Sequence, residues 1–196
     1  EHGILLNELH KKGKFIVGFA GAHGIANSLY AVIDAVALVE KQDVVLVLVG
    51  GGQEKNNLIK YTQKKKIDNV YFLPPVNKLA IPSLLKEMDV LYVGLQRQSL
   101  FRFGISPNKM FDYMMAAKPI IQAIEAGNNL VREADCGIDV EPDNKTEISK
   151  AILNLKAMSQ EERIEMGENG RRFVLSHHTY QVLGKQFLDI MINLVE

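Results

Sequence analysis

The sequence predicts an α/β fold: a doubly wound, Rossmann-like parallel sheet of six strands, followed by C-terminal helices. Three observations predict it. Short apolar runs alternate with helical segments along the chain. The run at 44–49 is wholly apolar, as in a parallel strand that is covered on both faces. Glycines follow several of these runs directly. At 196 residues, the chain suits one globular domain.

The predicted strands are the short apolar runs at residues 15–20, 44–49, 70–73, 90–93, 120–123 and 137–140. Apolar residues recur at helical spacing after the first run, and we expect helices at 28–40, 54–65, 78–88, 107–117, 130–134, 146–155, 160–176 and from about 180 to the end. Right-handed crossovers would place the carboxyl ends of the strands at one edge of the sheet. Ligands bind at that edge in such folds.

Charge and cysteine content exclude several classes of protein. The formal net charge is zero, so no overall field attracts nucleic acid or an anionic membrane. Cys136 is the only cysteine, which excludes an intrachain disulfide and fits a cytosolic compartment. No apolar run is long enough to cross a bilayer. Because the sequence begins at Glu1 without a methionine, we expect it to be part of a longer protein.

One short stretch is typical of a helix start that holds an anion. Ser106 is a good N-cap, and Pro107 suits the first helical position, where no N–H is needed. Lys109 then lies in the first turn, where a cation is unfavourable unless an anion is bound. Asp112 shares a face with Asn108 and Lys109, so it is placed to accept hydrogen bonds from ribose hydroxyls. The stretch therefore predicts a site for a nucleoside diphosphate and its sugar.

The same residues also fit an ordinary helix start, in which Lys109 and Asp112 form a solvated pair worth only ~0.2–0.5 kcal/mol. The glycines favour the nucleotide site. They gather at the expected ligand edge, in clusters at residues 21–24, 50–52, 104 and 127. Glycine there allows either a tight turn or the close approach of backbone to a ligand.

Other cofactor motifs are missing from the sequence. The glycines at 21–24 have the wrong spacing for the dinucleotide motif G-x-G-x-x-G, which disfavours NAD. No G-x-x-x-x-G-K-[ST] motif occurs, which excludes a P-loop kinase or ATPase. No Cys/His cluster has the spacing of zinc ligands, so we expect neither a metal nor a further cofactor.

Short motifs follow one another at residues 19–21, 48–52, 69–74, 88–90, 111–121, 136–138 and 166–171. Their order resembles the C-terminal, donor-binding domain of retaining GT-B glycosyltransferases of the family 4 type, over essentially the whole chain. The Ser-Pro-Asn-Lys variant at 106–109 is most similar to bacterial enzymes that build capsule, exopolysaccharide and O-antigen, including aminosugar transferases of the colanic-acid type.

The resemblance implies that residues 1–196 form a single nucleotide-sugar-binding domain, the C-terminal half of a GT-B fold. An acceptor-binding domain is then expected to precede Glu1. The donor would be a UDP-sugar, and hexosyl or N-acetylhexosaminyl transfer would run with retention to a glycan or lipid-linked acceptor in cell-surface polysaccharide synthesis. We expect a cytoplasmic enzyme, peripheral at the inner face of the membrane through the missing domain, and no activity from this fragment alone.

The resemblance also suggests roles for single residues. Asp112 stands at the second acidic position of the family signature and would bind the ribose, whereas Gly104 stands at the first. Residues 21–27 replace the usual Arg and Lys pair that grips the diphosphate. Lys109, with Arg97 or Arg102, is expected to supply that charge, and Lys109 is the candidate catalytic residue. The candidate donor contacts are Gly21, His23, Gly24, Gly51, Val76, Arg102, Ser106, Pro107, Asn108, Lys109 and Asp112.

Three points stay open at this level. His23 suits either a donor contact or a turn cap. A sugar-nucleotide epimerase of similar GT-B architecture, or a non-catalytic module that binds a nucleotide sugar, would share the same nucleotide site. The apolar residues of the last helix predict an exposed patch that packs across the missing domain.

Overall fold

The computed structural model describes residues 2–194. Within them, six parallel strands form one sheet in the order β3-β2-β1-β4-β5-β6, which confirms the predicted doubly wound α/β fold. The strand order reverses between β1 and β4, and a crevice for ligands is expected there. The strands are β1 (Phe15–Ala20), β2 (Val44–Val49), β3 (Val70–Leu73), β4 (Val90–Gly94), β5 (Ile120–Ala123) and β6 (Gly137–Asp139).

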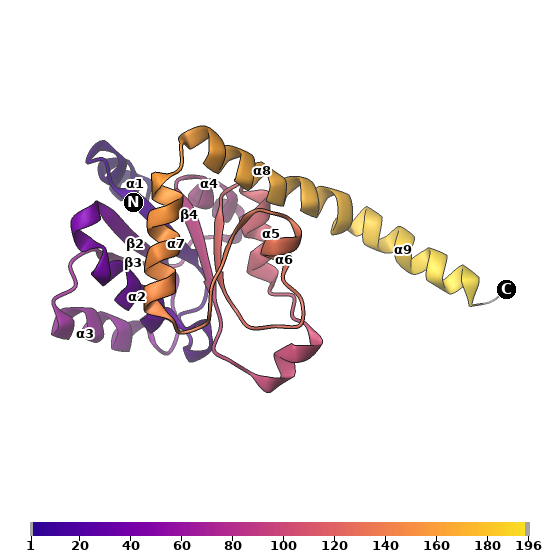
Figure 1. Ribbon diagram of the computed structural model, residues 1–196, viewed down its shortest axis with the longest axis horizontal. Helices are drawn as coiled ribbons and strands as arrows, with labels where there is room; N and C mark the ends of the chain where they lie inside the picture. The colour runs from indigo at the N-terminus through magenta and orange to yellow at the C-terminus, as the bar shows by residue number, and fades with distance from the viewer. Residues whose placement is uncertain (1, 195–196) are drawn as a thin grey trace.

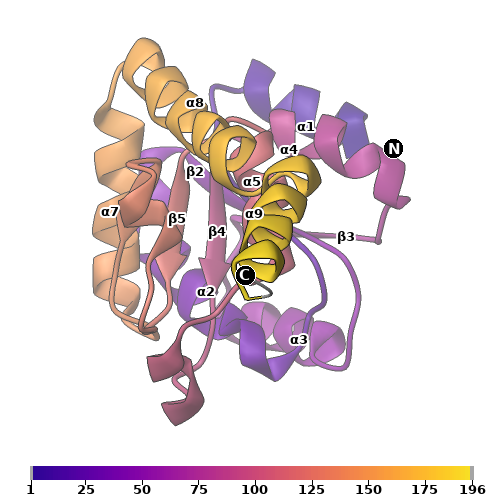
Figure 2. The ribbon, with the colours of Figure 1, turned by 90° about the vertical axis from the view of Figure 1, so that its right-hand side faces the viewer.

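Helices cover both faces of the sheet (Figures 1 and 2). One face packs against α2 (Leu29–Leu38), α3 (Lys55–Lys65) and α7 (Lys145–Ala157). The other face packs against α1 (His2–Lys11), α4 (Ile81–Lys86), α5 (Asn108–Met115), α6 (Leu130–Glu133) and α8 (Gln160–His177). The connections include four 3-10 turns in the described chain, η1 (Ile25–Asn27), η2 (Glu40–Gln42), η3 (Lys78–Ala80) and η4 (Ser99–Phe103).

The central strands show why their sequences are so apolar. In β2, Val45, Val47 and Val49 belong to the core on the α5 side. Val44, Leu46 and Leu48 belong to the core on the α2 side. Successive side chains of a strand point to opposite faces, so a strand covered on both faces has no polar position. The wholly apolar run therefore marks an interior strand of the sheet, as predicted.

The helices differ from the prediction at three places. Helix α1 was not predicted, although Leu6 and Leu9 have helical spacing and are both buried. The helix expected at 78–88 is split into η3 and α4, with Pro82 in the first turn of α4. Helix α5 is shorter at both ends than the range 107–117. The final helix, α9, is Tyr180–Asn193, and the predicted end at residues 195–196 lies outside the described residues.

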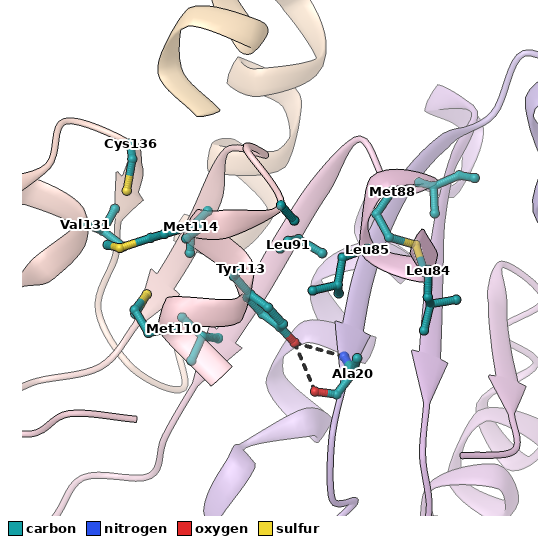
Figure 3. Close-up of a cluster of buried hydrophobic side chains, with 14 of the residues drawn as sticks. Ala20, Leu84, Leu85, Met88, Leu91, Met110, Tyr113, Met114, Val131 and Cys136 are labelled. Atoms are coloured by element: carbon teal, nitrogen blue, oxygen red, sulfur yellow. Dashed lines mark hydrogen bonds between the residues drawn. The ribbon is translucent and has the colours of Figure 1, made fainter. Parts of the chain in front are cut away.

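Strands β1 and β4 pair only over a short length. Beyond the paired residues, side chains form hydrogen bonds with the backbone groups of β1. The pairing covers Val17 and Gly18 of β1. Beyond it, the Tyr113 hydroxyl of α5 accepts a hydrogen bond from Ala20 N at 2.9 Å and donates one to Ala20 O at 3.3 Å (Figure 3). At the other end, Asp89 Oδ2 accepts from Ile16 N at 2.7 Å. Tyr113 thus attaches α5 to the carboxyl end of β1.

Two segments project from the domain with apolar side chains exposed. Helix α9 extends away from the sheet (Figure 1), and none of its residues is buried. Its exposed apolar residues include Phe187 and Ile190, which confirms the predicted patch. Turn η4 also projects (Figures 1 and 2), with Leu100 and Phe103 exposed. No helix within residues 2–194 is both long enough and apolar enough to span a membrane.

Replacing Tyr113 with Phe should lower the free energy of unfolding by about 1–3 kcal/mol, because Ala20 N and O would stay buried without their partner. Urea unfolding measures this value. Tyr92→Phe is the matched control. Tyr92 is fully buried, and its hydroxyl has no hydrogen-bond partner in the described residues. Removing that hydroxyl should therefore leave the free energy of unfolding unchanged. Equal losses in the two variants would contradict the role given to Tyr113.

Candidate functional site

Two glycine loops pack against each other at the carboxyl edge of the sheet. His23 N donates to Gly51 O at 2.7 Å, and Glu54 N donates to His23 O at 2.9 Å. Gly50 has φ +146°, and a Cβ there would lie 2.0 Å from Gly21 O. Gly52 has φ +148°, and its Cβ would lie 2.6 Å from His23 O. These two glycines are therefore required by loop-to-loop contact, a reason that the sequence alone did not distinguish from a ligand contact.

The start of α5 corrects two predictions, the capping role of Ser106 and the helical position of Pro107. Ser106 is not the N-cap: the helix begins at Asn108, and Pro107 is the capping residue, with no side-chain hydrogen bond. Pro107 has ψ 121°, an extended value, so the helix cannot include it. Ser106 and Asn108 are exposed. The first N–H groups of α5 consequently have no side-chain cap and face the loop edge with the positive end of the helix dipole.

Lys109, in the first turn of α5, is directed back over the end of β1. Its Nζ donates to Asn27 Oδ1 at 2.5 Å and lies 4.4 Å from the centre of the Phe19 ring. A Cβ on Gly21 would lie 3.5 Å from the same Nζ. Burial lowers the pKa of Lys109 to about 8. Among the described residues, no carboxylate pairs with this ammonium, although a buried cation is costly without a counter-charge.

His23 is fully buried beneath the glycine loops. Its ring lies between the rings of Phe19 and Phe72, at centroid distances of 6.1 and 6.3 Å. Neither ring nitrogen has a hydrogen-bond partner within residues 2–194, so the ring caps no turn there. Burial lowers the pKa of His23 to about 4, and the positive charges of Lys55 and Lys109 lower it further in the same direction. The imidazole is therefore neutral at pH 7.

Two neighbouring hollows share Ile81. The first, of about 370 Å³, is lined mainly by backbone and apolar groups and includes Gly21, Gly51 and Val76. The second, of about 540 Å³, lies between α4 and α5 and includes the exposed Asp112. The first hollow thus brings three of the predicted residues together, whereas Asp112 lies in a neighbouring groove that extends toward the start of β5. Gly24 lies farther along the first loop, where it precedes η1.

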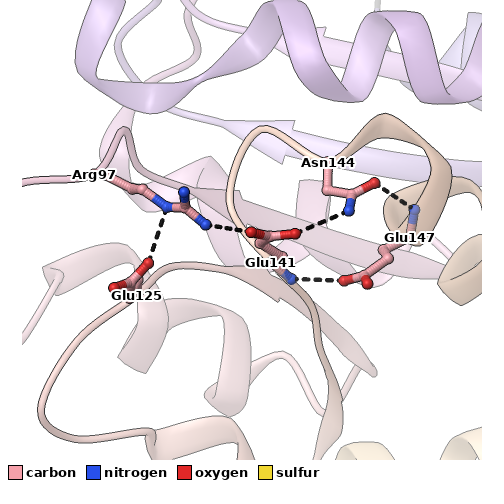
Figure 4. A network of polar contacts seen from close by, with 5 residues as sticks. All are labelled: Arg97, Glu125, Glu141, Asn144 and Glu147. Atoms are coloured by element: carbon pink, nitrogen blue, oxygen red, sulfur yellow. Dashed lines mark hydrogen bonds and ion pairs between the residues drawn. The ribbon is translucent and has the colours of Figure 1, made fainter.

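The two arginines considered as sources of positive charge lie elsewhere, around a different hollow. Arg97 is bonded to two carboxylates, Glu125 at 2.9 Å and Glu141 at 2.5 Å (Figure 4). Its charge is already compensated. Arg102 is exposed, and its guanidinium lies 4.6 Å from the centre of the Phe103 ring. Of the cations considered for the diphosphate, Lys109 is the one that the fold directs to the glycine loops.

Gly104, at the first acidic position of the signature, is held by its surroundings. It has φ +100°, and a Cβ there would lie 3.3 Å from Asn128 Oδ1. Asn128 accepts from Ile105 N at 2.8 Å and donates to Ile105 O at 3.0 Å, so the segment is tied to the loop after β5. Few residues other than glycine adopt this backbone conformation. A glutamate at position 104 would require a different path of this loop.

A model of the family described as glycosyl transferases group 1 matches residues 6–173. The chain belongs to the glycosyl transferases group 1 family. A protein of Methanocaldococcus jannaschii, named as an uncharacterized glycosyltransferase, is 22% identical to this chain over 173 residues. The match covers 88% of this chain and 42% of that protein. The group 1 domain described here thus spans less than half the length of this relative.

Solved structures of other proteins share the fold. Anabaena HepE in complex with UDP matches with a TM-score of 0.79 at 19% identity, over 98% of this chain and 52% of HepE. Staphylococcus aureus TarM in complex with Fondaparinux, alpha-GlcNAc-glycerol and UDP matches with a TM-score of 0.76 at 16% identity, over 90% of this chain and 35% of TarM. The C-terminal domain of LpcC, a group 1 protein of Francisella tularensis, matches with a TM-score of 0.69 at 18% identity, over 89% of this chain and 93% of that domain. The sequence resemblance to a GT-B half is confirmed at the level of family and fold.

Sequence reasoning missed three residues that shape the site. Asn27 bonds to Lys109, Tyr113 anchors α5, and Lys55 donates to Gly50 O at 2.7 Å and Leu73 O at 2.8 Å. Lys55 therefore caps the carboxyl ends of β2 and β3. No spacing rule links these residues to their partners, because the partners come from other loops and strands. The only sequence signal for any of them was the polar Asn27, which follows the glycines of the first loop.

The glycine loops give a stability prediction. Gly50→Ala should lower the free energy of unfolding by about 1–3 kcal/mol from backbone strain alone, with a further loss from contact with Gly21 O. Gly51→Ala is the matched control, because nothing lies within 4 Å of its Cβ position. Urea unfolding of both variants measures the difference. Loops that tolerate alanine equally well at both positions would contradict the close packing described above.

His23 gives a pH prediction. Its pKa in the folded chain, about 4, lies below the ordinary value of 6.5, so the unfolded chain binds the proton more tightly. The stabilisation is complete above pH 6.5 and is lost as the pH falls toward 4, by up to about 3 kcal/mol. Unfolding free energies of wild type and His23→Leu across this range test it. In His23→Leu the free energy of unfolding should depend less on pH than in the wild type. His177→Leu, at an exposed position, should keep the wild-type dependence.

Proposed function

We propose that this domain binds a nucleoside-diphosphate sugar, with UDP as the nucleotide, for glycosyl transfer. The observation that carries the proposal is Lys109, a partly buried ammonium beside Gly21 with a neutral amide as its hydrogen-bond acceptor. A diphosphate at the start of α5 would supply the missing negative charge. HepE and TarM both have UDP in their solved complexes, which supports uridine as the base.

In this proposal the nucleotide extends along the carboxyl edge from α5 toward β3. Lys109 and the first N–H groups of α5, including that of Asn108, bind the diphosphate. Asp112 accepts hydrogen bonds from the ribose hydroxyls. The base occupies the hollow lined by Gly51 and Val76, where backbone groups are available to it.

The proposed chemistry is retaining transfer without a metal. As the glycosidic bond to the donor sugar breaks, negative charge develops on the departing diphosphate. A fixed ammonium and preorganised N–H groups stabilise that charge more in the transition state than in the ground state. Lys109 is then the catalytic residue that this chain contributes. Removing such a donor typically costs on the order of 10²–10³ in turnover.

The acceptor is proposed to bind to a second domain, because the chain spans only part of its longer relatives. The exposed apolar residues of α9 are proposed to pack against that domain. The transferred group would be a hexosyl or N-acetylhexosaminyl unit, and the acceptor a glycan or lipid-linked intermediate of bacterial cell-surface polysaccharide synthesis at the cytoplasmic face of the membrane. The isolated domain would bind the nucleotide without catalysing transfer.

Calorimetric titration with UDP, GDP, ADP and TDP tests the nucleotide site. UDP should bind to this chain selectively. Lys109→Met should weaken UDP binding by about 10- to 100-fold, since a charged hydrogen bond is worth about 1.5–3 kcal/mol. Asp112→Asn should weaken UDP binding to a lesser degree. The exposed Lys150→Met and Asp189→Asn remove the same charges elsewhere and should leave the affinity unchanged.

Absence of nucleotide binding to the folded chain would contradict the proposal. Binding that is insensitive to Lys109→Met would contradict the assignment of the diphosphate to α5. Selective binding of a base other than uracil would overturn the choice of UDP while keeping the site.

A further inference from the structure

Asn27 holds a fixed orientation at the end of η1. Its Nδ2 donates to Ala22 O at 2.9 Å, and its backbone N donates to Gly24 O at 3.1 Å. Because the amide nitrogen is bonded to a carbonyl oxygen, the amide oxygen is turned the other way. That oxygen accepts the hydrogen bond from Lys109 Nζ at 2.5 Å, across 82 residues of sequence. The orientation of the amide thus follows from its two hydrogen bonds.

The surroundings of Lys109 contain little that could neutralise it. The titratable groups on the elements around it include His23 from the loop after β1, Lys55 from the start of α3 and Asp112 from α5 itself. His23 is neutral at pH 7 because burial depresses its pKa, and Lys55 is a cation. Asp112 is exposed and forms no ion pair with Lys109 in the described structure. Within the described structure, no carboxylate therefore offsets the charge of the ammonium.

A neutral acceptor at position 27 differs sharply from a carboxylate. Aspartate has nearly the same shape as asparagine and would accept the same hydrogen bond. It would also form a buried ion pair with Lys109, and the pair would have no net attraction for an anion. An alanine would leave the ammonium free to move and without an acceptor. Asparagine alone fixes the position of the cation and leaves its charge uncompensated.

We infer that Asn27 is a positioning residue, which holds the Lys109 ammonium beside Gly21 as an uncompensated cation that binds the diphosphate of the donor. The identity of the anion rests on the proposed function. The hydrogen bond, and its effect on Lys109, do not. The cation that Asn27 orients comes from α5, whereas Asn27 itself lies in the loop after β1.

The first experiment measures Lys109 without any nucleotide. Lysines of this chain are dimethylated with ¹³C, and the Lys109 signal is identified by its loss in Lys109→Arg. Its pKa in the wild type should lie near the value of about 8 that burial produces. Asn27→Asp should raise that pKa toward 10.5, the ordinary value for lysine, whereas Asn27→Ala should lower it. Asn154→Asp, on the exposed side of α7, introduces the same charge elsewhere and should leave it unchanged.

The second experiment titrates the same proteins with UDP at pH 7 and pH 9. The affinity of the wild type for UDP should decrease from pH 7 to pH 9, because Lys109 loses its proton as the pH rises through its pKa. Both Asn27→Asp and Asn27→Ala should weaken binding at pH 7 by about 10-fold or more, although their Lys109 pKa values move in opposite directions. Asn154→Asp should bind like the wild type. A merely structural role for Asn27 would not produce opposite pKa shifts with the same loss of affinity.

Each outcome bears on a different statement. A Lys109 pKa that does not respond to Asn27→Asp or Asn27→Ala overturns the positioning role, whether or not UDP binds. Wild-type affinity for UDP that is retained in both variants overturns it as well. If the two variants show opposite shifts in the Lys109 pKa but the wild type binds no nucleotide, the proposed function is overturned. The contact between Asn27 and Lys109 would then still hold. Thermal melts of both variants show whether each is folded before it is titrated.

Discussion

The candidate site depends on the way in which β1 and β4 separate beyond Gly18. The backbone groups of Ala20 that face β4 no longer have a strand partner, and the Tyr113 hydroxyl takes the place of one. This contact fixes α5 against the end of β1 (Figure 3). Lys109 lies one helical turn before Tyr113, so the same contact brings its ammonium to Gly21. A single buried hydroxyl thereby sets the position of the charge on which the proposed function rests.

The electrostatics of this edge are unusual for a folded protein. A partly buried ammonium, a neutral buried imidazole and uncapped N–H groups lie together, although each would be more stable with a partner of opposite polarity. Such unfavourable arrangements are concentrated at functional sites, where a ligand supplies what is missing. By contrast, Arg97 on the neighbouring loop is fully paired and contributes mainly to the loop structure (Figure 4).

The glycine loops make this electrostatic arrangement possible. They pack so closely that a single methyl group at Gly50 would contact the backbone of Gly21. The close packing buries His23 and limits the access of water to Lys109. The hollow beside β3 is lined by these glycines together with apolar side chains such as Val76 and Ile81.

The sequence by itself determined the strands, their parallel arrangement and the family. These features depend on local patterns: apolar runs for strands 44–49 and 120–123, helical spacing, and glycines at fixed places in the chain. Only the tertiary structure decided the position of α5 against β1, the burial of His23 and the acceptor for Lys109. The physical reason is that these properties arise between segments far apart in sequence, such as the 82 residues that separate Asn27 from Lys109. No spacing rule relates residues at such a separation until the sheet has brought them together.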